Sequence, residues 1–221
     1  ELFNPAKRSE VLRRSWDPSS SKKLVGFVGR LAAEKSVQRL AVLHDDPAIQ
    51  LVIVGDGPER DALQEIMPRA VFTGALGGEE LARAYASLDL FVHTGEFETF
   101  CQAIQEAQAS GVPTIGPRAG GPIDLIAHGD NGLLLDVVTF EEELPDAVAW
   151  ILDDARHAEL QAAARKSVEN KTWAALGDQL LGYYSEVLDA YERNVVHLFG
   201  RDVALPRWAP ARLGQPRKRR A

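Results

Sequence analysis

The sequence is poor in residues that form disulfides or bind metals. Cys101 is its single cysteine, which excludes an internal disulfide and a cluster of thiolate metal ligands. The five histidines show no paired ligand spacing and no Asp-x-Asp pair occurs, so the sequence predicts no metal and no other cofactor. No apolar run approaches the roughly 18 residues of a membrane span, and no basic leader followed by an apolar run precedes the first strand-like segment. We therefore expect a cytoplasmic protein.

Positive charge is scarce in the body of the chain and concentrated at its two ends. Residues 1–23 carry six Lys and Arg against three acids, and residues 201–221 carry seven against Asp202. The residues between them hold 12 basic and 28 acidic groups. An acidic body excludes nucleic acid as the main partner. The four cations at 217–220 allow two interpretations, namely contact with an anionic surface at the inner face of the plasma membrane, or a solubilising disordered end.

Short apolar runs alternate with segments of helical period from Leu24 onward. This alternation is typical of βα units and predicts an α/β fold, a doubly wound, Rossmann-like parallel sheet of about six strands with helices on both faces. Ligands of such sheets bind outside the carboxyl ends of the strands. The predicted strands are 24–28, 50–54, 70–73, 90–93, 113–116 and 132–135, and the predicted helices are about 34–43, 58–67, 78–87, 99–110, 121–127 and a later group within 140–191.

The two ends of the chain read as irregular. Turn signals predict that residues 1–23 are a connector arriving from an upstream segment. Residues 24–192 are predicted to form one domain that includes the C-terminal helices, and residues 193–221 a basic, partly disordered tail. Six large side chains in the last helix recur at three- and four-residue steps and predict either a core face or a face that docks another domain. They are Trp173, Leu176, Leu180, Tyr184, Val187 and Tyr191.

The stretch HTGEFETFCQAIQE (93–106) places acids around the start of an apolar helix. Thr99 and Gln102 have the spacing of a capping box, which predicts that the helix begins at Thr99. Glu98 then precedes the helix and Glu106 lies two turns inside it, so both can face one ligand. Carboxylates accept hydrogen bonds from sugar hydroxyls. The alternative is that Glu98 only favours the positive end of the helix and Glu106 faces solvent.

Backbone amides and two cations at the same edge would suit an anion. The N–H groups of Phe100, Cys101 and Gln102 point outward at the predicted helix start. Arg30 ends the first strand and Lys35 follows it by five residues, so the two could clamp a diphosphate. The alternative is that both cations are solvated, or paired with the nearby Glu34.

Three other features are weaker candidates. The turn VGDGPER (54–60) fails the dinucleotide fingerprint, because Arg60 stands where the third glycine belongs. Gly120 and Gly121 could offer amides to an anion, or could simply precede a helix that begins with proline. His93, at the end of a strand, reads as a packed residue more readily than as an acid or base.

Five motifs in order resemble one known family. VGRLAAEK, LVIVGDGPERDAL, VFTGALGGEELARAYASLDLFVHT, ETFCQAIQEAQASGVPTIG and GGPIDLIAHGDNGLLL are similar to the C-terminal, donor-binding half of glycosyltransferase family 4, retaining enzymes of GT-B fold. The resemblance covers about residues 24–190. It implies that this half binds a nucleotide sugar, and that an N-terminal domain of comparable size, which binds the acceptor, is missing from the chain.

The resemblance also assigns roles to residues. It implies that Arg30 and Lys35 hold the donor diphosphate, that Glu98 contacts the transferred sugar, and that Glu106 contacts the ribose. These cations and the helix amides would stabilise the departing diphosphate without a metal. The implied catalytic residues are Arg30, Lys35 and Glu98, and the implied donor-binding residues are Arg30, Lys35, Leu76, Gly77, Gly78, Glu98, Thr99, Phe100, Cys101, Gln102 and Glu106.

Within the family, the motif combination is most similar to actinobacterial GDP-mannose-dependent α-mannosyltransferases with lipid-linked acceptors. Many family members have glycine where this chain has Cys101, so we expect the extra side chain to narrow the sugar pocket. The chain alone is expected to bind nucleotide but to transfer poorly. Two alternatives stay open, a non-catalytic module that binds a nucleotide or phosphosugar, and a sugar-nucleotide epimerase-like enzyme.

Overall fold

The structure is a computed structural model, and it describes the backbone of residues 2–199 and the side chains of residues 2–191. The chain divides into two compact units, residues 1–170 and residues 171–221. The first unit contains the whole sheet. The last helix, which we expected in the same domain as the sheet, lies in the second unit.

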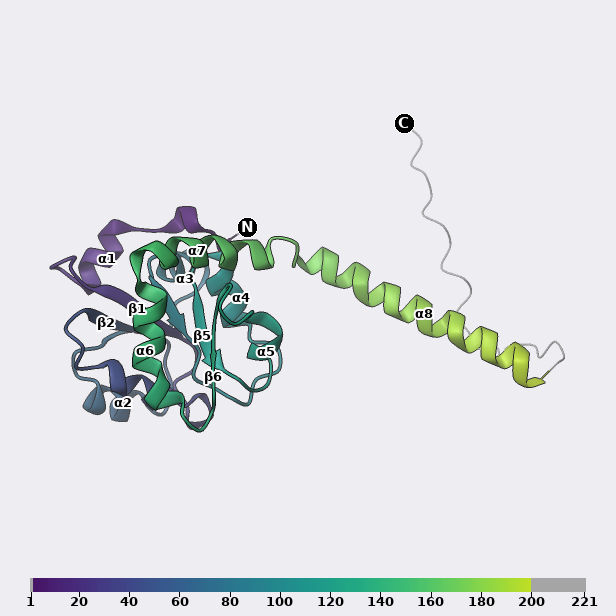
Figure 1. Cartoon of the computed structure of the whole chain (residues 1–221), viewed down its shortest axis with the longest axis horizontal. Coiled ribbons are helices and arrows are strands. Elements are labelled where there is room, and N and C mark those ends of the chain that lie inside the picture. The colour runs from purple at the N-terminus through teal and green to yellow at the C-terminus, as the bar shows by residue number, and fades with distance from the viewer. Residues whose placement is uncertain (1, 200–221) are drawn as a thin grey trace, which may run out of the picture. The chain divides into compact units, whose positions relative to one another are not determined.

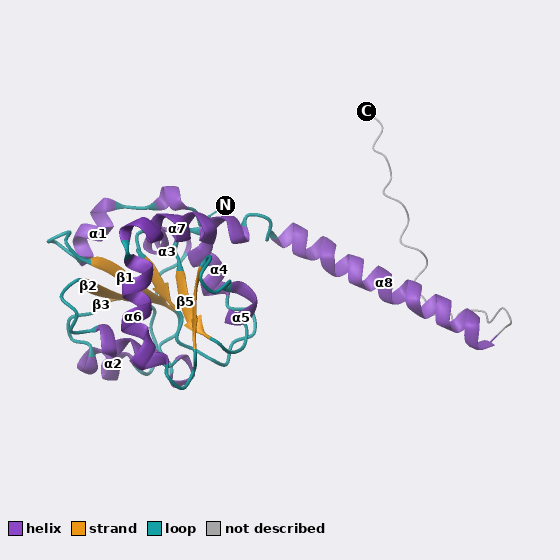
Figure 2. Cartoon of the chain, viewed as in Figure 1, coloured by secondary structure: helices purple, strands orange, loops and turns teal. Residues whose placement is uncertain are grey.

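Six parallel strands form one sheet, as the sequence predicts (Figures 1 and 2). The strand order is β3-β2-β1-β4-β5-β6, so the order reverses between β1 and β4. The strands are β1 (Lys23–Val28), β2 (Ile49–Val54), β3 (Val71–Gly74), β4 (Leu90–Val92), β5 (Thr114–Pro117) and β6 (Gly132–Leu135).

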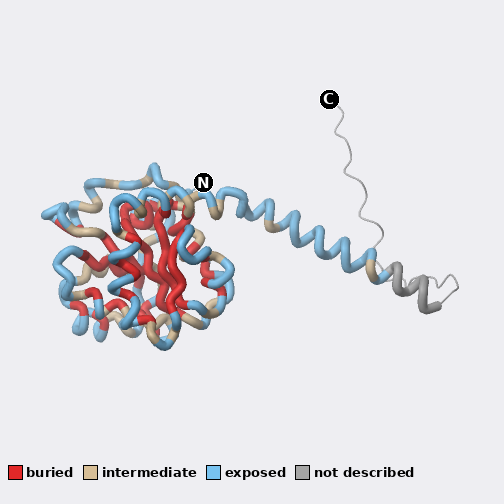
Figure 3. Tube along the Cα trace, in the orientation of Figure 1, coloured by how far each residue is buried: buried red, intermediate tan, exposed pale blue. Residues whose placement is uncertain are grey.

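Helices cover both faces of the sheet because neighbouring residues of its strands feed two separate cores. In β1, Val25 and Phe27 pack in one core and Leu24 in the other. The strands are therefore buried on both sides, and they form the buried centre of the first unit in Figure 3. One core takes side chains from η3 (Val37–Leu43), α2 (Arg60–Ile66), α6 (Phe140–Leu152) and α7 (Asp154–Val168), and the other from α1 (Glu10–Trp16), α3 (Gly78–Ala86), α4 (Gln102–Ala109) and α5 (Pro122–Leu125).

The N-terminal segment is more ordered than the connector we expected. It contains η1 (Pro5–Lys7) and α1, and Trp16 is buried in the core beside α3. Ser9 caps α1 by accepting a hydrogen bond from the Leu12 amide, and its own amide donates to the Ser87 hydroxyl. Residues 1–23 thus pack against the sheet domain through a capped helix.

Two predicted helical regions differ in the structure. Instead of one helix over 34–43, the chain forms η2 (Ala33–Lys35) and η3, because Ser36 between them has a φ of +50° that no right-handed helix accommodates. The last predicted face lies on α8 (Trp173–Phe199), where Trp173, Val187 and Tyr191 are exposed. Its side chains therefore do not form a core face. The predicted disordered tail overlaps α8 at 193–199, and its remainder, 200–221, lies outside the described residues.

Among the described helices, none combines the length and the apolar character needed to cross a membrane.

Candidate functional site

The loops that follow β1 and β4 meet at the carboxyl edge of the sheet because these two strands are neighbours. The hydroxyl of Thr94, after β4, donates a 2.6 Å hydrogen bond to the carbonyl of Lys35, after β1. Arg39 donates to the carbonyl of Thr94 at 2.9 Å. The strand order reverses at this point, and open α/β sheets bind ligands in the crevice that such a reversal creates.

Lys35 and Glu98 form an ion pair across this contact, from Nζ to Oε1. Both are partly buried, with 26% of the Lys35 side chain and 18% of the Glu98 side chain exposed. Because solvent screens such a pair less than a fully exposed one, the attraction is stronger than that of a surface ion pair. The structure therefore brings together two residues that the sequence places in one site.

Arg30 lies at the same edge but has a different partner. Its guanidinium forms an ion pair with Glu34, one turn further along the chain. This pairing with Glu34 is the alternative to diphosphate binding that the sequence left open. With 64% of the Arg30 side chain exposed, solvent screening makes the pair weak. Each of the two predicted diphosphate-binding cations thus has its own carboxylate.

The predicted start of α4 is wrong by three residues. Cys101, with a φ of +48°, is the residue before the helix, so Thr99 and Phe100 lie in the preceding loop. A residue in the left-handed region cannot continue a right-handed helix, and the Thr99 capping box does not form. Gln102 instead donates through its side chain to Glu106 at 3.0 Å. The first helical amide is therefore that of Gln102.

Cys101 turns its thiol into the protein. The side chain is buried with the core beside α4, and a Cβ at Gly121 would lie 2.9 Å from its Sγ. Burial raises the pKa of the thiol to about 12, and the carboxylate of Glu98 adds to this. The thiol is therefore not a nucleophile. We expected the Cys101 side chain to narrow a sugar pocket. In the structure the side chain packs in the core instead.

The Gly120 and Gly121 turn supports the loop that carries Glu98. The amide of Gly121 donates to the carbonyl of Glu98 at 2.7 Å, so it is not offered to an anion. A Cβ on Gly120, which has a φ of +56°, would lie 2.7 Å from the same carbonyl oxygen. Only glycine allows this approach without displacing the backbone. The turn therefore holds the backbone of Glu98 in place.

Glu106 is a half-buried residue of α4 that follows Glu98 by eight residues in the chain. Burial raises the pKa of Glu106, while Gln102 opposes that shift. The Tyr85 hydroxyl faces the carboxylate from α3 without a hydrogen bond of good geometry. The loop after β3 is open, because a Cβ on Gly77 or Gly78 would meet nothing within 4 Å, and Leu76 packs partly on the core.

His93 is a buried polar residue at this edge. Its side chain is 4% exposed, and neither ring nitrogen makes a hydrogen bond of good geometry among the described residues, although the backbone of Gly95 faces the ring. Burial lowers the pKa of His93 to about 4, although the carboxylate of Glu98 works in the opposite direction. The sequence predicts a packed residue and is right about the burial. Nothing in the sequence indicates that the nitrogens would be left without partners.

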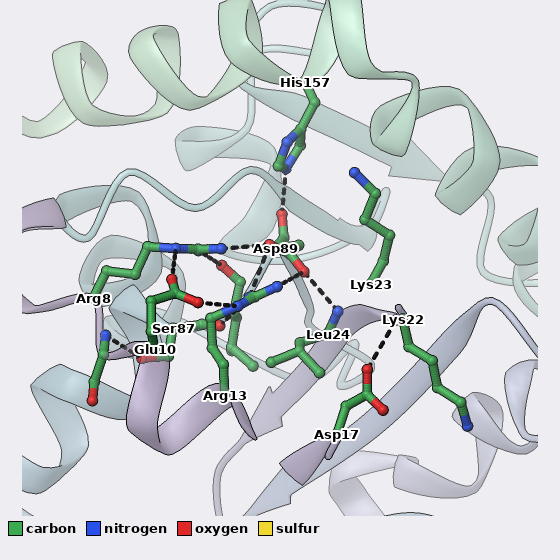
Figure 4. A network of polar contacts seen from close by, with 12 residues as sticks. Arg8, Glu10, Arg13, Asp17, Lys22, Lys23, Leu24, Ser87, Asp89 and His157 are labelled. Atoms are coloured by element: carbon green, nitrogen blue, oxygen red, sulfur yellow. Dashed lines mark hydrogen bonds and ion pairs between the residues drawn. The ribbon is translucent and has the colours of Figure 1, made fainter. Parts of the chain in front are cut away.

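A second polar cluster lies at the amino edge of the sheet, and sequence reasoning missed it (Figure 4). Asp89 accepts hydrogen bonds from Arg13 at 2.9 and 3.0 Å, from Arg8 at 3.2 Å and from the Leu24 amide at 2.7 Å. Burial alone would raise the pKa of Asp89, but these bonds outweigh it and the pKa lies below its ordinary value. His157 contacts the Asp89 carbonyl at 2.7 Å.

The amino-edge cluster borders a cleft of about 810 Å³ lined by residues of the N-terminal segment and α7. Its guanidinium groups already have partners. Arg8 and Arg13 contact Asp89, and Arg165 donates to the carbonyls of Phe3 and Ala109. We therefore place the functional site at the carboxyl edge, where Lys35 and Arg30 each hold a single carboxylate, and interpret the amino edge as the attachment of the N-terminal segment.

No group of three or more His, Cys, Asp and Glu side chains suited to a metal ion occurs in the part of the chain that the structure describes.

Comparison with known proteins gives one consistent family. The sequence profile of the family "Glycosyl transferases group 1" matches residues 8–170. A protein of Corynebacterium glutamicum named GDP-mannose-dependent alpha-mannosyltransferase is 66% identical over 96% of this chain and 52% of its own length. A protein of the same name from Mycobacterium tuberculosis is 57% identical over 85% of the chain and 49% of its own length.

Solved structures share the fold. The crystal structure of Anabaena HepE in complex with UDP aligns with 83% of this chain and 56% of its own, at a TM-score of 0.70 and 23% identity. The chain spans about half the length of the curated relatives it matches.

Proposed function

The chain belongs to the group 1 glycosyl transferases, and from this we propose that it is the donor-binding half of a retaining mannosyltransferase that uses GDP-mannose. The observation that carries the proposal is the meeting of Lys35 and Glu98 at the crevice between β1 and β4. A cation for phosphate and a carboxylate for hydroxyls stand side by side there. A nucleoside diphosphate sugar contains both groups.

For Arg30 and Lys35 to bind the donor diphosphate, each must exchange its carboxylate partner for the diphosphate. In the structure Glu98 is paired with Lys35, and Glu34 with Arg30. A diphosphate presents more negative charge than one carboxylate, and its oxygens match the fork of a guanidinium. Lys35 and Arg30 would therefore turn to the diphosphate, and Glu98 would be released to bind the hydroxyls of the transferred sugar.

The same two cations would act in the chemical step. When the bond between C1 of the sugar and the diphosphate oxygen breaks, negative charge grows on the leaving diphosphate. Lys35, Arg30 and the amide of Gln102 at the start of α4 would stabilise that charge. Glu98 orients the sugar, and the acceptor would attack from the face that the diphosphate leaves. Cys101 supplies no alternative nucleophile, since its thiol is buried and protonated.

We further propose that the acceptor is bound by a second domain. The relatives are about twice as long as this chain, and the exposed apolar side chains of α8, among them Leu180, Val187 and Tyr191, are a surface that another domain could cover. A glycolipid acceptor would agree with the four basic residues at 217–220. Sedimentation with anionic vesicles, with and without residues 215–221, tests the second point, and equal pelleting would contradict it.

A thermal-shift panel of GDP, UDP, ADP and their sugars tests donor binding directly. A ligand at about 100 times its dissociation constant stabilises by about 2.7 kcal/mol, or roughly 5 to 10 °C for a chain of this size. We expect GDP and GDP-mannose to raise the midpoint and Lys35→Ala, at the same ligand concentration, to reduce the shift to about a third. Arg69→Ala is the matched control, because it also removes a cation from an ion pair with one carboxylate, that of Asp45, at the opposite edge of the sheet. A panel in which no nucleotide raises the midpoint would overturn the proposal.

Transfer itself has to be measured on a protein that also carries the acceptor-binding half. Glu98→Ala should abolish product formation while GDP binding persists, because the carboxylate contacts the sugar and not the nucleotide. Tight GDP-mannose binding with no transfer in that longer protein would favour a non-catalytic binding module.

A further inference from the structure

His93 is a buried side chain whose hydrogen-bonding capacity is unused. It follows β4, and its backbone amide donates to the Ile115 carbonyl at 2.8 Å, so the sheet fixes the backbone. Both ring nitrogens are buried and neither makes a hydrogen bond of good geometry among the described residues, the backbone of Gly95 being the polar group that faces the ring. Buried polar groups in folded proteins are nearly always hydrogen-bonded, so an orphaned imidazole calls for a specific explanation.

The groups around the ring narrow that explanation. The imidazole and the Phe91 ring, two residues earlier on β4, have centroids 6.4 Å apart, so apolar packing supports one side. The charged groups that act on the ring are Glu98 and Lys35, which are paired with each other. A Cβ on Gly95, two residues after His93, would lie 3.5 Å from Oε1 of Glu98 and 3.6 Å from Cα of Lys35, so the end of β4 that carries His93 runs past the carboxylate that donor binding is expected to release.

We propose that His93 is a positioning residue for Glu98. When the donor diphosphate draws Lys35 away, an N–H of the neutral imidazole becomes the hydrogen-bond donor that holds the Glu98 carboxylate toward the sugar. This rests on the proposed function, and it adds a residue that the family motifs do not assign. A neutral imidazole suits the role because it donates one hydrogen bond without adding a buried charge.

The ion pair explains why the ring makes no hydrogen bond to Glu98. Lys35 holds the carboxylate, which then has no need of a second donor. A lone carboxylate left half-buried after Lys35 departs would lose hydrogen bonds, and a preformed donor avoids that loss. The ring is shielded from bulk solvent, since its side chain is 4% exposed.

Binding of GDP and GDP-mannose to His93 variants tests the proposal. His93→Phe keeps the ring shape and removes both nitrogens, and His93→Gln keeps an N–H donor. A hydrogen bond to a charged group corresponds to roughly tenfold to hundredfold in affinity. We expect His93→Phe to weaken GDP-mannose at least tenfold and GDP less than twofold, and His93→Gln to recover most of the loss. In a Glu98→Gln background, His93→Phe should change neither affinity more than twofold.

The thermal midpoint separates a positioning role from a structural one. Because unpartnered buried nitrogens destabilise the fold, ligand-free His93→Phe should melt at or above the midpoint of the wild type. A midpoint several degrees lower would show that the nitrogens are satisfied in solution, and would overturn the proposal.

Failure of this proposal and failure of the proposed function give different results. If the wild type binds GDP-mannose more tightly than GDP and His93→Phe preserves that preference, only the role of His93 is refuted. If the wild type binds neither ligand, the donor site and the role of His93 are refuted together.

Discussion

At the amino edge of the sheet Asp89 accepts hydrogen bonds from two arginines and a backbone amide, whereas at the carboxyl edge Glu98 is paired with Lys35. Both edges place a carboxylate among cations. They differ in how firmly that carboxylate is held. The donors to Asp89 attach the N-terminal segment to the sheet, while the ammonium of Lys35 at Glu98 can be exchanged for a ligand.

The comparison shows why the size of a cleft is a poor guide to function here. The cleft of about 810 Å³ lies at the amino edge, but its guanidinium groups are occupied by Asp89 and by backbone carbonyls. A ligand there would have to break bonds that hold the N-terminal segment. At the carboxyl edge the two cations predicted to bind the diphosphate, Lys35 and Arg30, each have one carboxylate to exchange for a ligand.

The largest expected effect is on stability at the amino edge. Asp89→Ala leaves Arg8 and Arg13 without their buried carboxylate and the Leu24 amide without its acceptor, and should lower the free energy of unfolding by about 4 kcal/mol. Urea denaturation measures it. Asp154→Ala, which breaks the exposed pair with Lys23, should change it by less than about 0.5 kcal/mol. Equal losses in the two variants would contradict the contrast between the edges.

At the carboxyl edge, lowering the pH should reduce the free energy of unfolding through the buried His93. The pKa of His93 is about 4 in the folded protein, against an ordinary 6.5, so as the pH falls the unfolded chain takes up the proton first. Stability is therefore lost as the pH falls below 6.5, by about 3 kcal/mol between pH 7 and pH 4. Urea titrations of wild type and His93→Phe at both pH values measure the difference, because other groups titrate in both proteins. Parallel losses would show that His93 is protonated in the folded state.

The next effect is on binding, with little change in stability. Lys35→Ala removes the partner of Glu98 and one diphosphate ligand, and should weaken GDP by about 2 kcal/mol, or roughly thirtyfold. Calorimetric titration measures this, and the free energy of unfolding should change by less than about 1 kcal/mol. If GDP affinity is unchanged while the fold is destabilised, Lys35 would belong with the structural network of the amino edge.

Much of the fold could be read from the sequence. Runs such as 51–54 are apolar throughout because each strand supplies both cores, and the six predicted strands match the structure to within a residue or two. Adjacent βα units also place Arg30, Lys35 and Glu98 at one edge, since the carboxyl ends of parallel strands share it. Their roles in donor binding stay predictions.

The rest depends on contacts between residues far apart in the chain. Nothing local marks Asp89 as the acceptor of Arg13, which lies 76 residues away. The spacing of Thr99 and Gln102 is that of a capping box, but the Gly121 amide donates to the Glu98 carbonyl and holds the loop, and with this tertiary contact the helix starts at Gln102. Local preference was overridden by packing.

The smallest effect concerns that displaced helix start, and it tests whether the carboxyl edge stores backbone strain. Cys101 has a φ of +48°, which disfavours any residue with a Cβ by about 1 kcal/mol, while its buried thiol packs against the Gly121 turn. Cys101→Ala loses the packing and keeps the strain, whereas Cys101→Gly loses the packing and relieves the strain. The glycine variant should therefore be the more stable of the two by about 1 kcal/mol in urea denaturation, the reverse of the order expected inside a helix. If the alanine variant is the more stable, the helix begins earlier in solution. Backbone strain at Cys101 would then not distinguish the carboxyl edge from the amino edge.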